Sequence, residues 1–334
     1  MIHNTYYITG INGFLGRHIV QELKKKDPSA YIVGLILPTD KDDDFSKFDV
    51  NPILVKGNIL NREDLVRFFS VEGKGEKYLI HAAGKISVYK KNDPLTTKTN
   101  VEGTRNVVEV AKEFNVSEMI YVSSVDALDR KEGNDPIYEQ DRYDENKVIG
   151  VYSKSKAISS NFVLEQASDN FKVIIVNPSA IIGPDDPLLA PINQAVKKAM
   201  NGKIPAVVKG GYNIVDVRDV ASGIVHLLDK GKNKESYLLV GHYIETKELI
   251  NLAATYNHAK QVKLILPHWL VKCFTPFIEL FSKISGNTPL FTSFSLDCLI
   301  QNSNYSYEKA NKLFGYQPRD IKESIKDTVD YYRS

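Results

Sequence analysis

Cysteine and metal-binding patterns are scarce in this sequence of 334 residues. The only two cysteines, Cys273 and Cys298, do not form a C-x-x-C motif, so neither a disulfide framework nor a zinc site is predicted, and buried, reduced thiols are expected. The seven histidines show no H-x-x-x-H or H-E-x-x-H spacing, which leaves no recognisable set of metal ligands. The chemistry of the chain is therefore expected from other residues, with no metal.

The sequence also lacks an excess of charge and a long hydrophobic run. Forty-three basic and 41 acidic residues leave a net charge of +2, which predicts no nucleic-acid partner. The most apolar part of the C-terminal region, residues 267–285, contains Lys272, Pro276 and Glu279 and therefore predicts no membrane span. We interpret it as a core or pocket helix whose aromatic residues would suit an apolar substrate. Because the first strand is expected from about residue 5, there is no room for a signal peptide, and a cytoplasmic protein is expected.

A glycine-spaced turn follows the first expected strand. Residues 5–21 have the sequence TYYITGINGFLGRHIVQ, in which aromatic and β-branched residues precede the glycines and apolar residues at helical spacing follow them. In such a turn Gly10 permits a tight bend, Gly13 lets a pyrophosphate approach the backbone, and Gly16 lets helix and strand pack closely. The free N–H groups and positive dipole end of the helix also suit a phosphate. The turn therefore predicts a dinucleotide site.

Segments typical of strands and helices alternate along the first 180 or so residues. The strands are expected at 5–9, 31–37, 53–56, 78–82, 117–122 and 172–176, and the helices between them include 62–69, 97–114 and 150–167. This alternation predicts the α/β class and a Rossmann doubly wound parallel sheet. Later helices are expected at 191–200 and 219–228, and residues 246–332 show mostly helical patterns.

These patterns predict two parts of unequal size. We expect a dinucleotide-binding Rossmann domain at 1–180, to which residues 213–240 return. A smaller, mostly helical C-terminal lobe, formed by residues 181–212 and 241–334, is expected to bind the substrate.

The end of the second strand carries no residue that selects between NAD and NADP. A domain that prefers NAD usually has an acidic residue about 20 positions after the glycines, whereas NADP needs a cation. This chain has Leu35-Ile36-Leu37-Pro38 at that place. The acidic residues between Asp40 and Asp44 would repel a 2′-phosphate, although Lys41 or Arg17 could offset this. The sequence therefore predicts NAD(P)(H) without distinguishing the two cofactors.

Two further strand ends are candidates for cofactor contacts. Asn58, after the third strand, has an amide that could pair with an adenine amino group. Ala82, Ala83 and Gly84 follow the fourth strand, and their small size leaves space for a flat group beside the backbone. His81, in the same strand, is expected to be a packed histidine rather than a catalyst.

An acid–base pair is predicted on the helix expected at 150–167. Tyr152 and Lys156 are four residues apart, so their side chains emerge from one face of that helix. The lysine cation is expected to lower the tyrosine pKa from its ordinary value near 10, which would make the pair a usable acid or base. Ser124, at the carboxyl end of the fifth strand, could hold a carbonyl oxygen near Tyr152, because open α/β sheets bind ligands at this edge.

Together these motifs resemble an extended short-chain dehydrogenase/reductase of the NAD-dependent epimerase/dehydratase superfamily. The resemblance covers essentially the whole chain. The residues that carry it are Thr9-Gly10-Ile11-Asn12-Gly13-Phe14-Leu15-Gly16, His81-Ala82-Ala83-Gly84, Asn100-Val101-Glu102-Gly103-Thr104, Val122-Ser123-Ser124, Tyr152-Ser153-Lys154-Ser155-Lys156, Asn177-Pro178-Ser179 and Val217-Arg218-Asp219-Val220-Ala221.

The resemblance implies a catalytic triad and a cofactor site. Ser124, Tyr152 and Lys156 would be the triad, with Tyr152 and Lys156 also contacting the cofactor and Pro178 lying against the nicotinamide. A monomer or a homodimer is implied. The remaining cofactor-binding residues would be Gly10, Asn12, Gly13, Phe14, Leu15, Gly16, Asn58, Ile59, Ala82, Ala83 and Gly84.

Within this superfamily the chain most closely resembles the dihydroflavonol reductase and 3β-hydroxysteroid dehydrogenase-like branch. Val125-Asp126 stand where dehydratases of this type have an Asp-Glu pair, and residues 181–334 contain only three arginines that could clamp a sugar nucleotide: Arg218, Arg319 and Arg333. The resemblance implies an NAD(P)-dependent dehydrogenase/reductase acting on a small, apolar ketone, aldehyde or secondary alcohol. A nucleotide-sugar epimerase and a non-catalytic dinucleotide-sensing protein are the alternatives.

Overall fold

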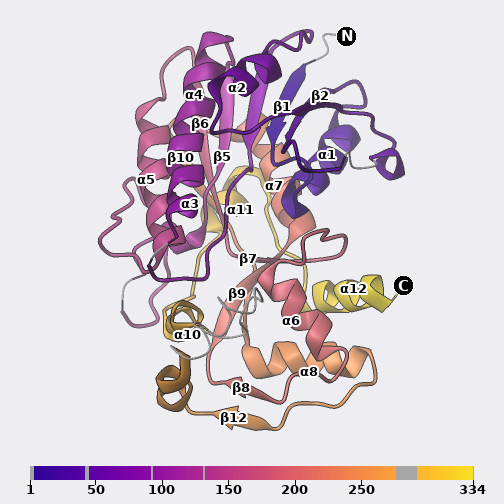
Figure 1. Cartoon of the computed structure of the whole chain (residues 1–334), viewed down its shortest axis with the longest axis vertical. Helices are drawn as coiled ribbons and strands as arrows, with labels where there is room; N and C mark the ends of the chain where they lie inside the picture. Colours follow the sequence, from indigo (N-terminus) through magenta and orange to yellow (C-terminus); the bar gives the residue numbers. More distant parts are fainter. Residues whose placement is uncertain (1–3, 42–44, 92, 131, 276–291, 334) are drawn as a thin grey trace.

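A seven-stranded parallel sheet forms the larger part of the molecule, with the strand order β10-β6-β5-β4-β1-β2-β3 (Figure 1). This computed structural model describes residues 4–41, 45–91, 93–130, 132–275 and 292–333. The predicted doubly wound parallel sheet is confirmed, because every neighbouring pair of its strands is parallel. The strands are β1 (Thr5–Thr9), β2 (Tyr31–Ile36), β3 (Ile53–Lys56), β4 (Lys77–His81), β5 (Glu118–Val122), β6 (Lys172–Pro178) and β10 (Glu235–Leu239).

Helices cover both faces of this sheet. Tyr7 of β1 points into a core shared with α2 (Arg62–Phe69), α4 (Gly103–Glu113) and α5 (Val151–Glu165). Its neighbours Tyr6 and Ile8 point into the opposite core, beneath α1 (Phe14–Lys26), α7 (Val217–Lys230) and α11 (Glu308–Phe314). Successive strand residues face opposite sides, so a strand covered on both faces is buried along its length, as β1 is and as β2 is from Ile32 onwards.

The prediction of one continuous α-helix at 97–114 is wrong. The structure has a short helix, α3 (Pro94–Thr97), then a π-helical turn, Lys98–Glu102, and only then α4. Asn100 lies in the turn, and its amide bonds the backbone of Lys85 and the hydroxyl of Ser155. A π turn of this kind often occurs at functional sites, and apolar periodicity does not reveal it.

The smaller lobe contains short strands as well as the expected helices. Its three-stranded sheet consists of β7 (Ala180–Ile182), β9 (Gly211–Asp216) and β11 (His242–Glu245), and β8 (Ala206–Val208) pairs with β12 (Leu264–Leu266). Its helices include α6 (Pro191–Ala199), α8 (Thr246–Tyr256), α10 (Ser293–Ile300) and α12 (Ile321–Arg333). Within the segment 213–240, α7 and β10 belong to the large sheet layer, whereas β9 belongs to the small sheet.

Only part of the apolar segment 267–285 falls within the described residues. Residues 268–275 are helical, and residues 276–285 lie outside the described part of the chain. None of the helices that the structure describes is long and apolar enough to cross a membrane.

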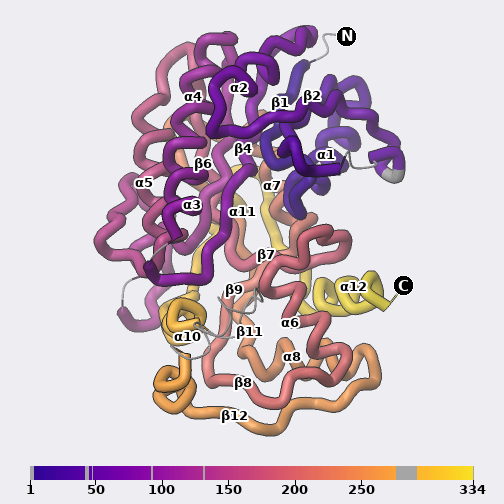
Figure 2. Tube along the Cα trace, in the orientation of Figure 1, coloured from indigo at the N-terminus to yellow at the C-terminus, as the bar shows by residue number. Residues whose placement is uncertain are grey.

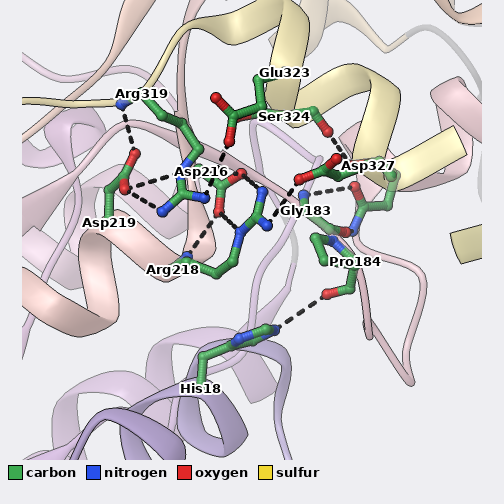
Figure 3. A network of polar contacts seen from close by, with 12 residues as sticks. His18, Gly183, Pro184, Asp216, Arg218, Asp219, Arg319, Glu323, Ser324 and Asp327 are labelled. Carbon is green, nitrogen blue, oxygen red and sulfur yellow. Dashed lines mark hydrogen bonds and ion pairs between the residues drawn. The ribbon is translucent and has the colours of Figure 1, made fainter. Parts of the chain in front are cut away.

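An ion-pair network joins the large sheet layer to the smaller lobe (Figure 3). The Asp216 carboxylate, fully buried at the start of α7, accepts hydrogen bonds from the backbone and guanidinium of Arg218. Arg218 also pairs with Asp327 of α12, and Arg319 pairs with Asp219 of α7. Burial by itself would raise the pKa of Asp216, but the hydrogen bonds and charge of Arg218 lower it below its usual value. Both guanidinium groups are thus engaged in holding the lobes together.

His81 is a packed strand-end histidine, as the sequence predicts. It is completely buried, with Nδ1 2.6 Å from the Thr9 hydroxyl of β1 and Nε2 3.0 Å from the Thr104 hydroxyl of α4. Burial, assisted by the nearby charge of Lys156, lowers its pKa to about 3. A neutral imidazole therefore connects two strands and a helix in the centre of the large layer.

This burial makes the fold sensitive to acid in a defined range. In the unfolded chain His81 takes up a proton as the pH falls below the ordinary histidine pKa of about 6.5. In the folded chain it stays neutral until about pH 3. The free energy of unfolding therefore falls as the pH falls through this range. We expect His81→Asn to be less stable than the wild type at pH 7, with a difference that shrinks towards pH 4, measured by urea unfolding. A difference that does not change with pH would contradict this explanation.

Candidate active site

The glycine turn between β1 and α1 has the close approaches that the spacing predicts. Gly10 has a positive φ of 74°, and a Cβ there would lie 2.8 Å from the Ala83 nitrogen. At Gly16 a Cβ would lie only 2.1 Å from the Gly10 oxygen. With any larger residue at this position, helix and strand could not pack this closely. Gly13 precedes α1, whose first turn contains no acidic residue and whose N-terminus has no side-chain cap. The N–H groups of that turn are therefore available to an anion.

The turn opens into a cavity of about 430 Å³ at the carboxyl ends of the large sheet. This is within the usual size range for ligand pockets, at the edge where open parallel sheets bind ligands. Most of the predicted cofactor and catalytic residues line it: Gly10, Gly13, Phe14, Leu15, Gly16, Ala82, Gly84, Ser124, Tyr152, Lys156 and Pro178.

Four predicted cofactor residues, Asn12, Asn58, Ile59 and Ala83, do not line this cavity. The side-chain oxygen of Asn58, Oδ1, accepts a hydrogen bond from the Leu60 backbone nitrogen, so that oxygen serves a local turn. The Asn12 amide donates to the Lys41 carbonyl.

Ser124, Tyr152 and Lys156 reach the cavity from two adjacent elements. Ser124 is the second residue after β5, and its hydroxyl accepts a hydrogen bond from the Asp126 nitrogen at 3.1 Å. Tyr152 and Lys156 lie one turn apart at the start of α5, on the cavity side. The Lys156 ammonium donates to the Val122 carbonyl at 2.7 Å and is only 4% exposed.

Burial dominates the acid–base properties of this pair. It lowers the pKa of Lys156 to about 7. It raises the pKa of Tyr152, the charge of Asp126 adds to the increase, and a hydrogen bond with Ser124 opposes it. The expected decrease of the Tyr152 pKa is not found in this structure, because burial is the largest influence on the phenol and raises its pKa.

Asn100 supports the site in a way that the sequence did not reveal. A Cβ at Gly84 would lie 3.3 Å from the Lys156 nitrogen and 3.4 Å from the Asn100 side-chain oxygen. The amide also bonds to the backbone of Lys85, directly after Gly84. Asn100 thereby fixes the chain that passes beside Lys156. The sequence places Asn100 in one of the motifs of the family resemblance, but helical periodicity does not predict its contacts with Lys85 and Ser155.

The far wall of the cavity was also missed by the sequence analysis. Arg130 and Asp126 contribute to it from the loop after β5, and the smaller lobe contributes Tyr212, Phe294, Cys298 and Tyr305 among others. Of the segment 267–285, expected as a core or pocket helix, the described residues 267–275 do not line this cavity, whereas α10 supplies Phe294 and Cys298. These residues are distant in sequence, so only the packing of the lobe brings them together.

The arginines considered for phosphate binding are engaged in other contacts. Arg17 is buried and pairs with Asp185 at 3.2 Å, and Arg218 and Arg319 belong to the network at the lobe junction. Arg333 donates to the Asn257 side chain. None of these four lines the cavity described above.

Comparisons with known proteins agree with this arrangement. The model of the NAD dependent epimerase/dehydratase family matches residues 6–241. The chain is 27% identical to a Synechocystis sp. protein whose name marks it as a candidate dihydroflavonol 4-reductase, over 98% of this chain and 94% of that protein. It is 28% identical to the decarboxylating sterol-4-alpha-carboxylate 3-dehydrogenase of Mus musculus, over 97% and 90%. The crystal structure of gox2253 superposes with a TM-score of 0.82 at 31% identity, covering 98% of each chain.

The different surroundings of Gly13 and Gly16 predict different defects. A Cβ at Gly16 would overlap backbone atoms, whereas a Cβ at Gly13 would have the Gly10 oxygen, at 3.1 Å, as its nearest neighbour among the described residues. We expect Gly16→Ala to lose roughly 1–3 kcal/mol of stability through overpacking. Gly13→Ala should fold with a smaller loss but bind NADH more weakly, measured by urea unfolding and by fluorescence titration. Equal NADH affinity of Gly13→Ala and the wild type would contradict a pyrophosphate at this turn.

Proposed function

Because the chain belongs to the NAD-dependent epimerase/dehydratase family, we propose that it transfers hydride between a nicotinamide dinucleotide and a small, apolar ketone, aldehyde or secondary alcohol. The observation that carries this proposal is the single cavity that contains the glycine turn together with Ser124, Tyr152 and Lys156. The turn suits a pyrophosphate, and the three side chains suit proton exchange at a carbonyl or alcohol oxygen.

The residues at the cavity fit a nicotinamide dinucleotide. Gly10, Gly13 and Gly16 leave the backbone open to a pyrophosphate at the N-terminus of α1. Gly84 leaves space beside Lys156, which a Cβ would narrow to 3.3 Å, and Lys156 and Pro178 would hold the ribose and the nicotinamide. When bound, the cofactor supplies or accepts the hydride.

The protein's own side chains would manage the proton and the substrate oxygen. Ser124 donates a hydrogen bond to that oxygen, and Tyr152 donates its proton to it in reduction or accepts one in oxidation. The raised pKa of Tyr152 keeps the phenol protonated, which suits reduction. Lys156, whose burial lowers its pKa to about 7, can gain or lose a proton at neutral pH and is the candidate to restore the proton on Tyr152.

An apolar, ring-bearing substrate agrees with the cavity wall and with the relatives. Besides Ser124, Tyr152 and Lys156, the lining of the cavity includes these apolar residues: Phe14, Ile181, Leu188, Ile192 and Phe294. The relatives are named for a dihydroflavonol and for a sterol carboxylate. Both names support a substrate in which a carbonyl or alcohol is attached to an apolar framework.

Tyr152→Phe tests the proposed acid–base role. We expect turnover of NADPH or NADH with a reactive carbonyl to fall by about 10²-fold or more, because a general acid–base group is removed. The dinucleotide affinity should be nearly unchanged. Tyr138→Phe is the matched control, because Tyr138 is 52% exposed and does not line the cavity. Unchanged turnover in Tyr152→Phe would contradict the mechanism. Tight dinucleotide binding by the wild type without turnover of any carbonyl in a broad panel would instead favour a sensing protein.

A thermal-shift comparison separates this proposal from sugar-nucleotide epimerisation. A ligand that binds only the folded state raises its stability. Since Arg218, Arg319 and Arg333 are engaged elsewhere, we expect NADH to raise the unfolding temperature and UDP-glucose to have no further effect on the protein with NADH bound. A clear additional increase with UDP-glucose would favour an epimerase.

A further inference from the structure

The wall of the cavity opposite the glycine turn contains a buried guanidinium with an unused donor. The Arg130 side chain is 7% exposed and pairs through Nη2 with Asp126, four residues earlier. Its Nε is buried without a hydrogen-bond partner among the described residues. A buried donor without an acceptor is unfavourable, and few native groups are left in this state.

The aromatic ring of Tyr305 lies beside Arg130 and carries a second unpartnered group. The Tyr305 ring centroid is 5.8 Å from the Arg130 guanidinium carbon, and the buried Tyr305 hydroxyl has no hydrogen-bond partner in the described part of the chain. Burial raises the pKa of this hydroxyl although Arg130 opposes the increase, so it remains a donor. Both side chains line the cavity that contains Ser124 and Tyr152.

The position of Tyr305 is fixed by backbone hydrogen bonds. Asn304 accepts a hydrogen bond from the Ile137 nitrogen at 2.8 Å, and Ser306 donates one to the Ile137 carbonyl at 2.9 Å. The Asn304 side chain also donates to the Asn134 carbonyl. The segment that carries Tyr305 is thus attached to the loop that follows Arg130. Two donors without acceptors are therefore held in a defined place rather than on a free side chain.

Among the described residues of the cavity, the Ser179 hydroxyl is also buried without a hydrogen-bond partner, whereas the following polar groups have partners. The Asp186 carboxylate accepts hydrogen bonds from the Ala190 backbone and the Asn193 amide, and the Tyr212 hydroxyl donates to the Ser295 carbonyl. The charge of Arg130 is balanced by Asp126. What is missing beside Arg130 and Tyr305 is therefore an acceptor oxygen, and Asp126 would repel a second carboxylate placed there.

From this geometry we infer that Arg130 and Tyr305 recognise a second, uncharged oxygen on the substrate, a hydroxyl or carbonyl other than the reacting one. This inference rests on the proposed function and specifies its substrate class. The reacting oxygen lies at Ser124 and Tyr152, and the second oxygen accepts hydrogen bonds from Arg130 Nε and the Tyr305 hydroxyl. An apolar framework fills the space between them. Asp126 sets the preference, because it leaves Arg130 with donors but without net charge to attract an anion.

Matched ring ketones test this recognition. The probes are cyclohexanones that carry a methyl, a hydroxyl or a carboxylate group at ring position 3 or 4. Their affinities are measured by calorimetry on the NADH complex of Tyr152→Phe, so that binding is read without turnover. We expect the better hydroxyl probe to bind about fivefold or more tightly than its methyl counterpart, and the carboxylate probe to bind most weakly. When Tyr305→Phe is combined with Tyr152→Phe, most of this preference for the hydroxyl probe should be lost. Tyr138→Phe, added in the same way, should leave it unchanged.

Asp126→Asn is a second test variant, in which the binding preference should shift towards the carboxylate probe. It keeps the size of the side chain but leaves Arg130 with a net charge, so the carboxylate probe should gain about fivefold or more relative to the hydroxyl probe. A ratio of probe affinities is compared within each variant, which removes any effect of the substitution common to all probes.

The outcomes for this inference and for the proposed function are distinct. Equal binding of the methyl and hydroxyl probes, no binding of any probe, or an Asp126→Asn variant with unchanged preference would overturn the role of Arg130 and Tyr305. Selective binding of the hydroxyl probe with no turnover in the wild type would support that role and contradict the oxidoreductase. Turnover of all probes without preference would support the oxidoreductase alone.

Discussion

The parallel alignment of four neighbouring strands is the constraint on which the site depends. β1, β4, β5 and β6 run in one direction, so their carboxyl ends meet at one edge of the sheet. Gly10, Ala82, Ser124 and Pro178 come at or just after those ends and line one cavity. The approach of Gly10 to Ala83 requires a glycine, and His81 connects β1 and β4 to α4 one step behind it. Any shift of β1 against β4 would therefore disturb the phosphate turn and the core together.

Removal of water from this edge governs the chemistry that the side chains can perform. The same burial that lowers the pKa of Lys156 to about 7 raises that of Tyr152. Burial therefore brings the pKa of Lys156 close to neutrality and keeps the Tyr152 phenol protonated. Asn100 and the Val122 carbonyl hold the surroundings of Lys156 in place. An oxygen at Ser124 would consequently face a protonated phenol.

The two parts of the molecule contribute differently to the cavity. The large sheet layer supplies the glycine turn and the reactive groups, and the smaller lobe closes the cavity with Phe294, Cys298 and Tyr305 from α10 and the residues after it. The network of Asp216, Arg218 and Arg319 holds α12 and α7 together at the junction. On the proposed function, the wall that contains Arg130 and Tyr305 would select the substrate. Tyr305 lies far along the chain from Ser124, Tyr152 and Lys156.

The sequence by itself determined the doubly wound sheet, the place of the glycine turn and the candidates Ser124, Tyr152 and Lys156, because these depend on local periodicity and on fixed spacings within one strand, turn or helix. Strand β3 and helix α2 have the bounds that the sequence predicts. Tertiary structure alone decided the π turn at Asn100, the direction in which the Tyr152 pKa shifts, and the residues that form the far wall of the cavity. Each of these depends on side chains that are far apart in the sequence, as Arg130 and Tyr305 are, and on how completely packing excludes water from them. Local patterns contain no information on either.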